Sequence, residues 1–377
     1  MTLVSGPQVV TPPAPRRSRA PLGGVIALAA ALAAAGTLLA LSPGGSEPAG
    51  PPQPRTVEQV WPDAKRASIP GVLPDGTPYS PAYLLDESTS IGTATDPRGT
   101  VLRLVLRDAA GAVRELRRLP VGGSPQYSGF TRAGDEVAWA ESVTTDFGAA
   151  RTEMWIASVA GGTPRKITGD TGDVVFFNSQ YDMVIDANRL YWVAVAPGQD
   201  QVTEVRSVPL AGGEVTVRTE PGAWALSAWP WLVSAGSGQS GPVELRDLGT
   251  GKVTTVPAAA TELVTCSPTW CRVLVLAGDG PSRIDLMRPD GTDRRPIADG
   301  AATASVIDVA LLDRFEVLSQ GTDLTTQRLL LYDLRSKQSA IVAGSAGMVL
   351  CRGGLLWWST GAAQAPEWHT LDLRSLT

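Results

Sequence analysis

The amino-acid sequence predicts an all-β fold, a β-propeller of about seven four-stranded blades with six or eight as alternatives, preceded by one N-terminal transmembrane helix. Two observations predict the propeller. Short β-rich segments recur in the same order beyond about residue 80, with a two-residue turn before the last strand of each unit. The 40 glycines and 30 prolines are spread along the chain, which suits short strands joined by turns better than helices. One uncharged apolar segment near the N-terminus predicts the transmembrane helix.

The apolar segment covers residues 22–41, about twenty residues, which as a helix would match the roughly 30 Å hydrocarbon core of a bilayer. Arg16, Arg17 and Arg19 precede it and Glu47 follows, so the positive-inside rule places the N-terminus in the cytoplasm. We expect a cytoplasmic tail over residues 1–20, a signal-anchor helix over 21–42, a Pro/Gly-rich linker over 43–55 and an extracytoplasmic propeller domain over 56–377. The expected location is therefore the cell membrane, with a single span.

Two other targeting signals fit parts of the same segment. A cleaved signal peptide would use the small residues of Ser42-Pro43-Gly44 and would release a secreted protein, but the apolar stretch is longer than a usual signal-peptide core. The Arg16-Arg17 pair is typical of twin-arginine signals, but Ala20 and Pro21 follow soon after, where such signals carry hydrophobic residues. We favour the uncleaved anchor.

The repeat is clearest at the turn before each final strand. Glycine, asparagine and aspartate tolerate the positive φ that tight hairpin turns require. The turn pairs are Ala110-Gly111, Gly161-Gly162, Gly212-Gly213, Thr250-Gly251, Asp290-Gly291 and Ser336-Lys337. Successive pairs lie about 38 to 51 residues apart, which is close to the period of propeller blades.

Runs rich in β-branched and aromatic residues predict the strands around these turns. Second strands are expected at residues 136–142, 189–196, 231–236, 272–278, 315–321 and 355–361. Third strands are expected within residues 153–159, 203–210, 242–248, 282–288, 327–334 and 367–373. A further, irregular unit is expected over about 82–120, with residues 101–108 as its third strand.

The last unit predicts how the ring closes. Its third strand lies at residues 367–373, and the four residues that follow leave no room for a fourth strand. An open ring would leave unpaired strand edges, and propellers commonly supply the missing strand from the other terminus. We therefore expect a strand between about residues 56 and 79 to complete the last blade.

Two segments of the second unit resemble the repeats of the Tol-system periplasmic propellers, the TolB-like family. FTRAGDEVAW at residues 130–139 is similar to that family's Phe-Ser-Pro-Asp-Gly-x-x-Ile-Ala-Phe phrase, and residues 153–168 are similar to its partner phrase. The sequence departs from the family at Arg132-Ala133, where the family has Pro-Asp, and the detailed match covers about 40 residues. The resemblance implies a propeller and a habit of binding proteins, peptides or envelope components, without implying membership of a Tol complex.

Cys266 and Cys271 flank a four-residue turn between a first and a second strand, so both lie across a hairpin within reach of a disulfide. A disulfide agrees with an oxidising, extracytoplasmic compartment. The alternative, a redox or metal pair, lacks the two-residue spacing and the nearby histidine of such sites. Cys351 occupies the matching position of the last unit without a partner, which predicts a buried thiol or, alternatively, intermolecular pairing.

Few residues suggest catalysis or metal binding. His369 is the one histidine, so a Ser-His-Asp triad would depend on it, and we expect it to pack or cap in its strand. The acidic turns at Asp170 and Asp173, and at Asp290 and Asp293, lack the ligand spacing of a calcium loop. We therefore expect no catalytic residue, no cofactor and no metal site.

A cluster of tryptophans suggests either ligand stacking or core packing. The cluster comprises Trp224, Trp229, Trp231, Trp357 and Trp358. These side chains could stack on sugars or peptides, but packing between neighbouring blades is the interpretation that we favour.

Charge and architecture together limit the function. The net charge of −5 and the isoelectric point near 5.1 exclude the basic footprint of a nucleic-acid-binding protein. We expect a non-enzymatic binding or scaffolding module for a protein, a peptide or a cell-wall component. The alternative is an extracytoplasmic enzyme, carbohydrate-active or a quinone-dependent dehydrogenase, with carboxylates at the propeller channel. Three or more convergent Asp, Glu or Arg side chains with shifted pKa values at the channel would favour the enzyme, and an apolar channel would favour the binding module.

Overall fold

The computed structural model describes residues 54–144, 150–234, 242–278, 280–321, 326–362 and 366–377. The predicted tail over 1–20 and signal anchor over 21–42 lie outside these residues, as does most of the linker over 43–55. Within the described ranges, none of the helices has both the length and the apolar character that a membrane span requires. The anchor therefore stays a prediction.

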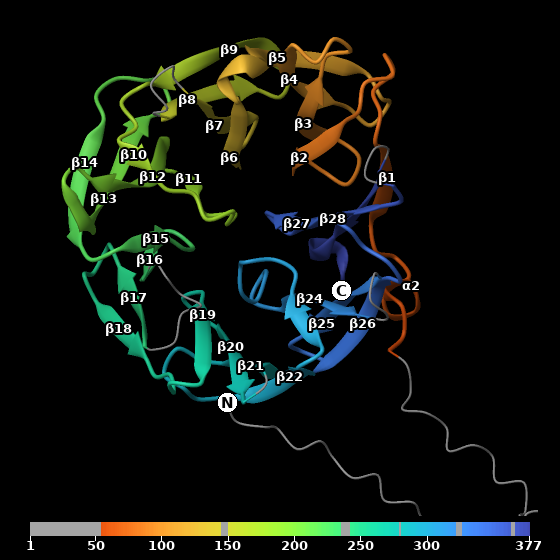
Figure 1. The fold of residues 1–377 in the computed structure, drawn as a ribbon, viewed down its shortest axis with the longest axis vertical. Helices are drawn as coiled ribbons and strands as arrows, with labels where there is room; N and C mark the ends of the chain where they lie inside the picture. Colours follow the sequence, from red (N-terminus) through yellow and green to blue (C-terminus); the bar gives the residue numbers. More distant parts are fainter. Residues whose placement is uncertain (1–53, 145–149, 235–241, 279, 322–325, 363–365) are drawn as a thin grey trace, which may run out of the picture. The chain divides into compact units, whose positions relative to one another are not determined.

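The described residues form seven antiparallel sheets arranged around a ring, which confirms the predicted all-β propeller (Figure 1). Blade 1 holds β2 (Ser80–Leu84), β3 (Ser90–Thr95), β4 (Val101–Arg107) and β5 (Val113–Pro120), and blade 2 holds β6 (Gln126–Ala133), β7 (Glu136–Thr144), β8 (Ala150–Ser158) and β9 (Gly161–Thr168). Blade 3 holds β10 (Asp173–Val174), β11 (Met183–Asp186), β12 (Arg189–Ala196), β13 (Gln199–Pro209) and β14 (Thr216–Pro221). Blade 4 holds β15 (Trp224–Leu226), β16 (Trp231–Ser234), β17 (Val243–Asp247) and β18 (Val253–Val256).

The remaining blades follow in chain order until the ring closes. Blade 5 holds β19 (Glu262–Cys266), β20 (Cys271–Ala277), β21 (Gly280–Met287) and β22 (Arg295–Asp299), and blade 6 holds β23 (Ala302–Ala304), β24 (Phe315–Gly321), β25 (Gln327–Asp333) and β26 (Gln338–Ala343). Blade 7 holds β27 (Val349–Arg352), β28 (Leu355–Thr360), β29 (Glu367–Asp372) and β1 (Arg66–Pro70). The only helical turns are α2 (Val57–Val60), η1 (Val121–Gly123) and η2 (Leu373–Ser375) among the residues that the structure describes.

The N-terminal strand closes the ring as the sequence predicts. β1 pairs antiparallel with β29, from Arg66 opposite Leu371 to Pro70 opposite Glu367. Ile69 at its centre is fully buried. Blade 7 therefore combines three strands from the C-terminal end of the chain with one from the N-terminal side.

The segment before β1 also contacts blade 6. The Ile341 N–H of β26 donates a hydrogen bond to the Arg55 carbonyl at 2.8 Å. Val57 of α2 and Trp61 lie in the apolar core between blades 6 and 7, where the Trp61 ring meets the edge of Phe315 at 6.1 Å between centroids. One short stretch thus joins the two blades on either side of the closure.

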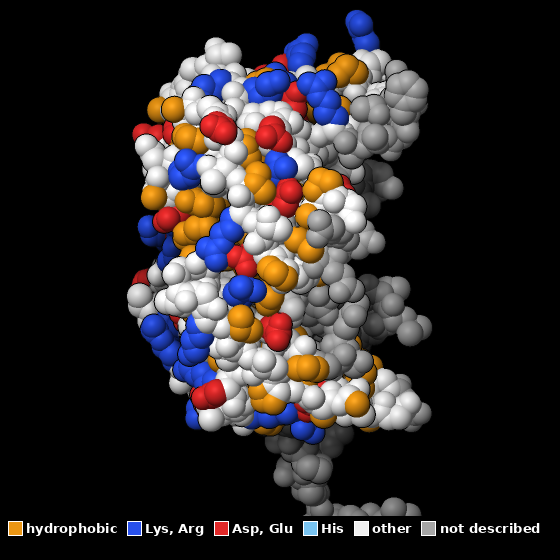
Figure 2. Space-filling view, turned by 90° about the vertical axis from the view of Figure 1, so that its left-hand side faces the viewer, with side chains coloured by type: hydrophobic (Ala, Val, Ile, Leu, Met, Phe, Trp, Pro, Cys, Tyr) orange, Lys and Arg blue, Asp and Glu red, His pale blue; other side chains and the backbone are white. Residues whose placement is uncertain are grey.

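Neighbouring blades are held by apolar cores and by arginines. Large side chains such as Trp139, Trp192 and Trp357 are fully buried, and burying such a side chain stabilises the fold by about 1.5–3 kcal/mol. Two arginines on outer strands donate hydrogen bonds to the next blade, in each case to a carbonyl just after its third strand. Arg165 donates to the Leu210 carbonyl, and Arg218 donates to the Leu248 carbonyl. The outer surface at the left of Figure 1 has basic and acidic side chains interspersed with apolar ones (Figure 2).

The irregular blade is not the expected one. The unit predicted as irregular over about 82–120 is a regular four-stranded sheet that begins at Ser80. Blade 3 departs from the pattern instead, because its inner strand is split into β10 and β11, which both pair with β12. The eight residues between them, 175–182, leave the sheet.

We predict that the ring depends on β1. A chain that begins at residue 71 leaves the β29 edge unpaired and removes Val57, Trp61 and Ile69 from the core, so it should melt more than about 10 °C below the full chain or without a cooperative transition. A chain that begins at residue 54 is the matched control and should melt with the full chain. Circular dichroism melting measures both, and equal melting temperatures for the two truncations would contradict the closure.

Candidate functional site

Two segments that leave their sheets meet at the centre of the ring. Residues 175–182 interrupt the inner strand of blade 3, and residues 305–313 follow the short inner strand β23 of blade 6. The Ser179 hydroxyl donates to Asp308 Oδ1 at 2.6 Å, and the Gln180 N–H donates to Asp308 Oδ2 at 3.0 Å. We call these two segments together the central bridge. Figure 1 shows one of them beside β11 and the other beside β24, both reaching toward the middle of the ring.

Blade 7 and the bridge itself supply further hydrogen bonds. Arg352, the last residue of β27, donates through Nη1 to the Ser179 carbonyl at 2.6 Å, and the Gly353 N–H donates to Gln180 Oε1 at 3.0 Å. Within the bridge, Asp182 Oδ1 accepts the Phe177 N–H at 2.8 Å. Three blades therefore hold one short segment in place.

A second set of contacts fixes residues 305–313. Arg272 of β20 forms an ion pair with Glu316 at 2.9 Å and donates to the Ile307 carbonyl at the same distance. Glu316 Oε1 accepts the Ala310 N–H at 2.6 Å. These charges are buried and paired, as burial of charge requires.

The bridge carries two carboxyl groups with raised pKa values. Burial raises the pKa of Asp182 to about 6, although the Phe177 N–H and the nearby Arg352 charge oppose the shift. Burial also raises the pKa of Asp308, against the hydrogen bonds from Ser179 and Gln180. Asp182, Asp308 and Arg352 are thus buried close enough to influence one another's charge, and both carboxyl groups accept hydrogen bonds within the bridge.

A pocket opens beside the bridge, on the face that carries the turns between first and second strands. Its volume is about 270 Å³. The bridge contributes Tyr181, Leu312 and Asp313 to its walls, and the first turns of blades 4 and 5 contribute Trp229 and Thr269. We call it the central pocket.

A smaller cavity of about 80 Å³ adjoins the central pocket. The two share Tyr181, Ser267 and Val309 as walls, and Asp308 lines the smaller one. Asp308, which joins the two segments of the bridge, therefore lines a cavity that adjoins the central pocket.

One wall of the central pocket has strained backbone. Ala310, Leu312 and Asp313 have φ values of 50°, 55° and 54°, in the left-handed region that residues other than glycine rarely adopt. The hydrogen bonds from the Ala310 N–H to Glu316 and from the Thr269 hydroxyl to Asp313 hold this conformation. Such strain persists only where the surroundings fix it, and it concentrates at functional sites.

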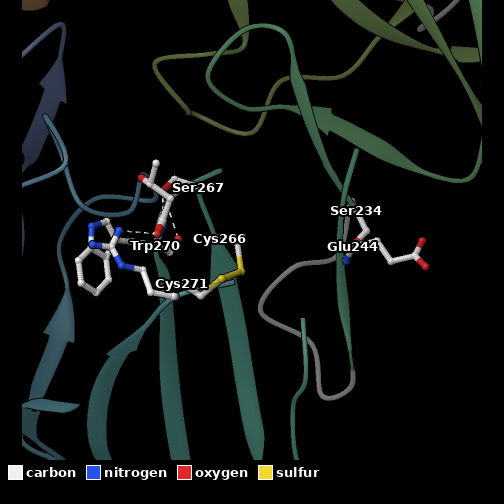
Figure 3. Close-up of a disulfide and its surroundings, with 8 residues drawn as sticks. Ser234, Glu244, Cys266, Ser267, Trp270 and Cys271 are labelled. Carbon is white, nitrogen blue, oxygen red and sulfur yellow. Dashed lines mark hydrogen bonds between the residues drawn. A yellow bond between two sulfur atoms is a disulfide. The ribbon is translucent and has the colours of Figure 1, made fainter. Parts of the chain in front are cut away.

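The neighbouring wall, which Thr269 joins to Asp313, lies at the end of the disulfide-linked hairpin. Cys266 of β19 and Cys271 of β20 are paired in register and joined by a disulfide, so the structure contains the predicted bond. Figure 3 shows Ser267 and Trp270 in the turn beyond it, where the Trp270 N–H donates to Ser267 Oγ at 3.1 Å. The disulfide therefore holds the turn that carries Thr269.

His369 and Cys351 lie elsewhere. His369 Nε2 is 2.8 Å from the Thr360 hydroxyl and its ring stacks on Trp358. It lines a groove of about 730 Å³ between blades 6 and 7 that shares no wall with the central pocket. Cys351 is a buried free thiol, as predicted, and burial raises its pKa.

The acidic turns have structural partners. Asp290 accepts the Thr292 N–H at 3.0 Å, Asp293 pairs with Arg295 at 3.1 Å, and Asp170 pairs with Arg206 at 2.8 Å. Among the described residues, no three His, Cys, Asp or Glu side chains gather as metal ligands would.

The tryptophan cluster divides into two groups. Trp224, Trp357 and Trp358 are buried in the cores, as the packing interpretation predicts. Trp229 and Trp231 line the central pocket instead.

Sequence reasoning missed Tyr181, Asp308 and Asp313, because no local sequence pattern marks the two segments that leave their sheets.

Comparisons with solved structures support the fold. A prolyl endopeptidase is 14% identical with a TM-score of 0.52, over 85% of this chain and 50% of that chain. A puromycin-hydrolysing peptidase from Mycobacterium tuberculosis is 12% identical with a TM-score of 0.52, over 86% of this chain and 56% of that chain. TolB from Acinetobacter baumannii is 11% identical with a TM-score of 0.36, over 72% of this chain and 76% of that chain. No family profile and no curated protein matches the chain in sequence.

At these identities the similarity shows a β-propeller and nothing finer. TolB is among the similar structures, but membership of the TolB-like family is not confirmed. The expectation of a non-enzymatic protein is contradicted at the level of the fold, because two of the similar structures, each with a TM-score of 0.52, are peptidases. This chain spans about half the length of those two peptidase chains.

The disulfide predicts a simple thiol count. The chain has three cysteines, of which two are bonded. We expect one reactive thiol per chain after denaturation without reductant and three after reduction. Replacing Cys266 and Cys271 together by alanine should cost about 2 kcal/mol of unfolding free energy, the entropy of so short a loop. Three reactive thiols before reduction would contradict the bond.

Asp182 predicts a pH dependence of stability. Its pKa rises from 3.8 to about 6 on folding, so the folded chain keeps a proton that the unfolded chain loses, and the free energy of unfolding falls as pH rises through that range. Asp182→Asn should remove this fall, so the variant should gain stability over wild type between about pH 4.5 and pH 7.

Urea unfolding of both proteins at several pH values measures the difference. Asp290→Asn is the control, because hydrogen bonds from Thr292 lower the pKa of Asp290 and keep it ionised in this range. A difference between Asp182→Asn and wild type that does not vary with pH would show that the carboxyl group is not buried as described.

Proposed function

We propose that this chain is a membrane-anchored, extracytoplasmic propeller that binds a peptide or a segment of a protein in the central pocket. The observation that carries the proposal is the pocket itself, formed at the centre of the ring by the bridge and the first turns of blades 4 and 5. The apolar segment over residues 21–42 and the disulfide support the extracytoplasmic location.

The size of the pocket favours a partner that inserts a side chain. A volume of about 270 Å³ lies below the range of about 300–1,000 Å³ typical of clefts for whole small molecules. Protein complexes often depend on one or two side chains that fill a well-packed pocket near the centre of an interface. The central pocket fits that role.

The rigidity of the walls supports binding without rearrangement. Arg352 of blade 7 donates to the Ser179 carbonyl, and Ser179 joins the two segments of the bridge by donating to Asp308. The disulfide links the two strands that flank the Thr269 turn. A preformed site avoids much of the ordering cost of association. The pocket therefore suits a fixed recognition surface.

One observation favours a second candidate, an extracytoplasmic enzyme with carboxylates at the channel. Asp308 lines the adjoining cavity and its pKa is raised. Both carboxyl groups of the bridge are buried and accept hydrogen bonds from it, however, which supports a role in holding the bridge. Cleavage of peptides by the purified chain that is lost in Asp308→Asn would favour the enzyme.

A selection experiment tests the proposed site. A random peptide library is displayed on phage and selected on the purified full chain. We expect the enriched peptides to bind wild type at least about tenfold more tightly than Ala228→Trp, which fills the pocket from one wall. Val253→Trp, at an exposed position on outer strand β18, is the matched control and should bind as wild type does.

Melting temperatures of the two variants exclude a loss of folding. The proposal is wrong if selection enriches no peptide, or if the enriched peptides bind Ala228→Trp as tightly as wild type.

A further inference from the structure

We infer that the central pocket takes a cationic side chain, a lysine or an arginine of the partner. The inference rests on the proposed function and names the chemical group that the pocket recognises.

The charge of the described walls is negative. Asp313 is the one charged residue that lines the pocket, and no lysine or arginine does. Asp313 is exposed at the wall, and its Oδ1 accepts the Thr269 hydroxyl proton. Asp308 adds a second carboxyl group in the adjoining cavity.

The arginines on adjoining segments have partners of their own, and none of them lines the pocket. Arg288 donates to the Thr269 carbonyl at 3.1 Å, and its guanidinium group lies over the Trp270 ring, outside the pocket. Arg272 pairs with Glu316 at 2.9 Å, and Arg374 makes two hydrogen bonds to Asp372 at 2.7 and 2.9 Å. Arg352 donates to the Ser179 carbonyl on the bridge. These guanidinium groups therefore do not supply a cation to the pocket wall.

Tyr181, a wall of the pocket, lies close to both carboxyl groups. Burial, with the nearby charges of Asp308 and Asp313, raises the pKa of its hydroxyl group to about 12. Asp308 and Asp313 contribute the part of this shift that favours a nearby cation, whereas burial, the larger cause, disfavours charge of either sign.

The aromatic walls suit the rest of such a side chain. Trp229 and Trp231 line the pocket, and tryptophan is the best aromatic partner for a cation. Trp229 packs on Tyr191 at 3.9 Å between ring centroids, which fixes its ring. Leu312, 48% exposed, offers an apolar surface for the methylene stem of lysine or arginine.

Other side chains fit less well. A carboxylate would meet Asp313 without any cation on the wall, and repulsion between like charges opposes that arrangement. An apolar side chain would remove water from the Asp313 carboxylate and leave its charge with the Thr269 hydroxyl but no cation. A cationic side chain is the one that suits both the carboxylate and the aromatic lining.

The charge of Asp313 can be removed without changing its shape. Asp313→Asn keeps the acceptor oxygen for Thr269, and asparagine tolerates the left-handed backbone at φ 54°. Asp293→Asn is the matched control, because Asp293 is also exposed and left-handed at φ 51° but pairs with Arg295 outside the pocket.

Binding is measured with four blocked pentapeptides of alanine whose central residue is lysine, arginine, norleucine or glutamate. The full chain is labelled with fluorotryptophan, and fluorine NMR follows the resonances of Trp229 and Trp231 during titration. We expect the lysine and arginine peptides to bind wild type at least about tenfold more tightly than the other two. Their affinity should fall about three- to tenfold in Asp313→Asn and stay unchanged in Asp293→Asn.

The outcomes separate this inference from the proposed function. The inference is overturned if norleucine binds as tightly as lysine, or if Asp313→Asn binds the lysine peptide as wild type does. Phage-selected peptides that need the open pocket of wild type would in that case still support the proposed function. Selected peptides that bind Ala228→Trp as tightly as wild type would overturn both the inference and the proposed function.

Discussion

The pairing of β1 with β29 is the contact on which the rest of the molecule depends. A propeller blade buries its faces only against two neighbours, so an incomplete blade 7 would open the cores on both sides of the closure. The five-residue ladder from Arg66 to Pro70 completes that blade, and Val57 and Trp61 extend the same segment into the core beside blade 6. Only a closed ring brings blades 3 and 6 to the distance at which Ser179 can donate to Asp308 across the centre.

The central bridge links this architecture to recognition. Two inner strands give up part of their pairing, and the released segments are held by buried charges instead of by a sheet. The contacts that hold them include the Arg272–Glu316 ion pair and the hydrogen bond from Arg352 to the Ser179 carbonyl. The lining of the pocket contains the Asp313 carboxylate and no lysine or arginine. The buried charges of the bridge thus hold the ring, while the exposed Asp313 carboxylate is the group that we propose binds a cationic side chain. The same separation explains why raised pKa values at the channel do not by themselves identify catalytic residues.

Local chemistry made much of the fold predictable. The hairpin turns at residues such as Gly161 and Gly212 and the β-rich runs beside them identify most strands, and the missing fourth strand of the last unit predicts the closure by β1. The disulfide followed from the position of Cys266 and Cys271 across one turn. The bridge could not be predicted, because Ser179 and Asp308 lie 129 residues apart and neither segment has a local signature. The tryptophans illustrate the limit, since Trp224 and Trp229 are close in sequence but serve the core and the pocket respectively.

Hydrogen–deuterium exchange of the full chain reports whether the closed ring holds the central bridge as a fixed wall of the pocket. We expect the backbone amides of β1 and of residues 177–182 to exchange as slowly as those of strands that are paired on both sides, such as β12 and β24. The Gln180 amide, bound to Asp308, and the Phe177 amide, bound to Asp182, should be the slowest of the bridge. Exchange of residues 177–182 at the rate of an exposed turn such as 290–293 would contradict a preformed pocket at the centre of the ring.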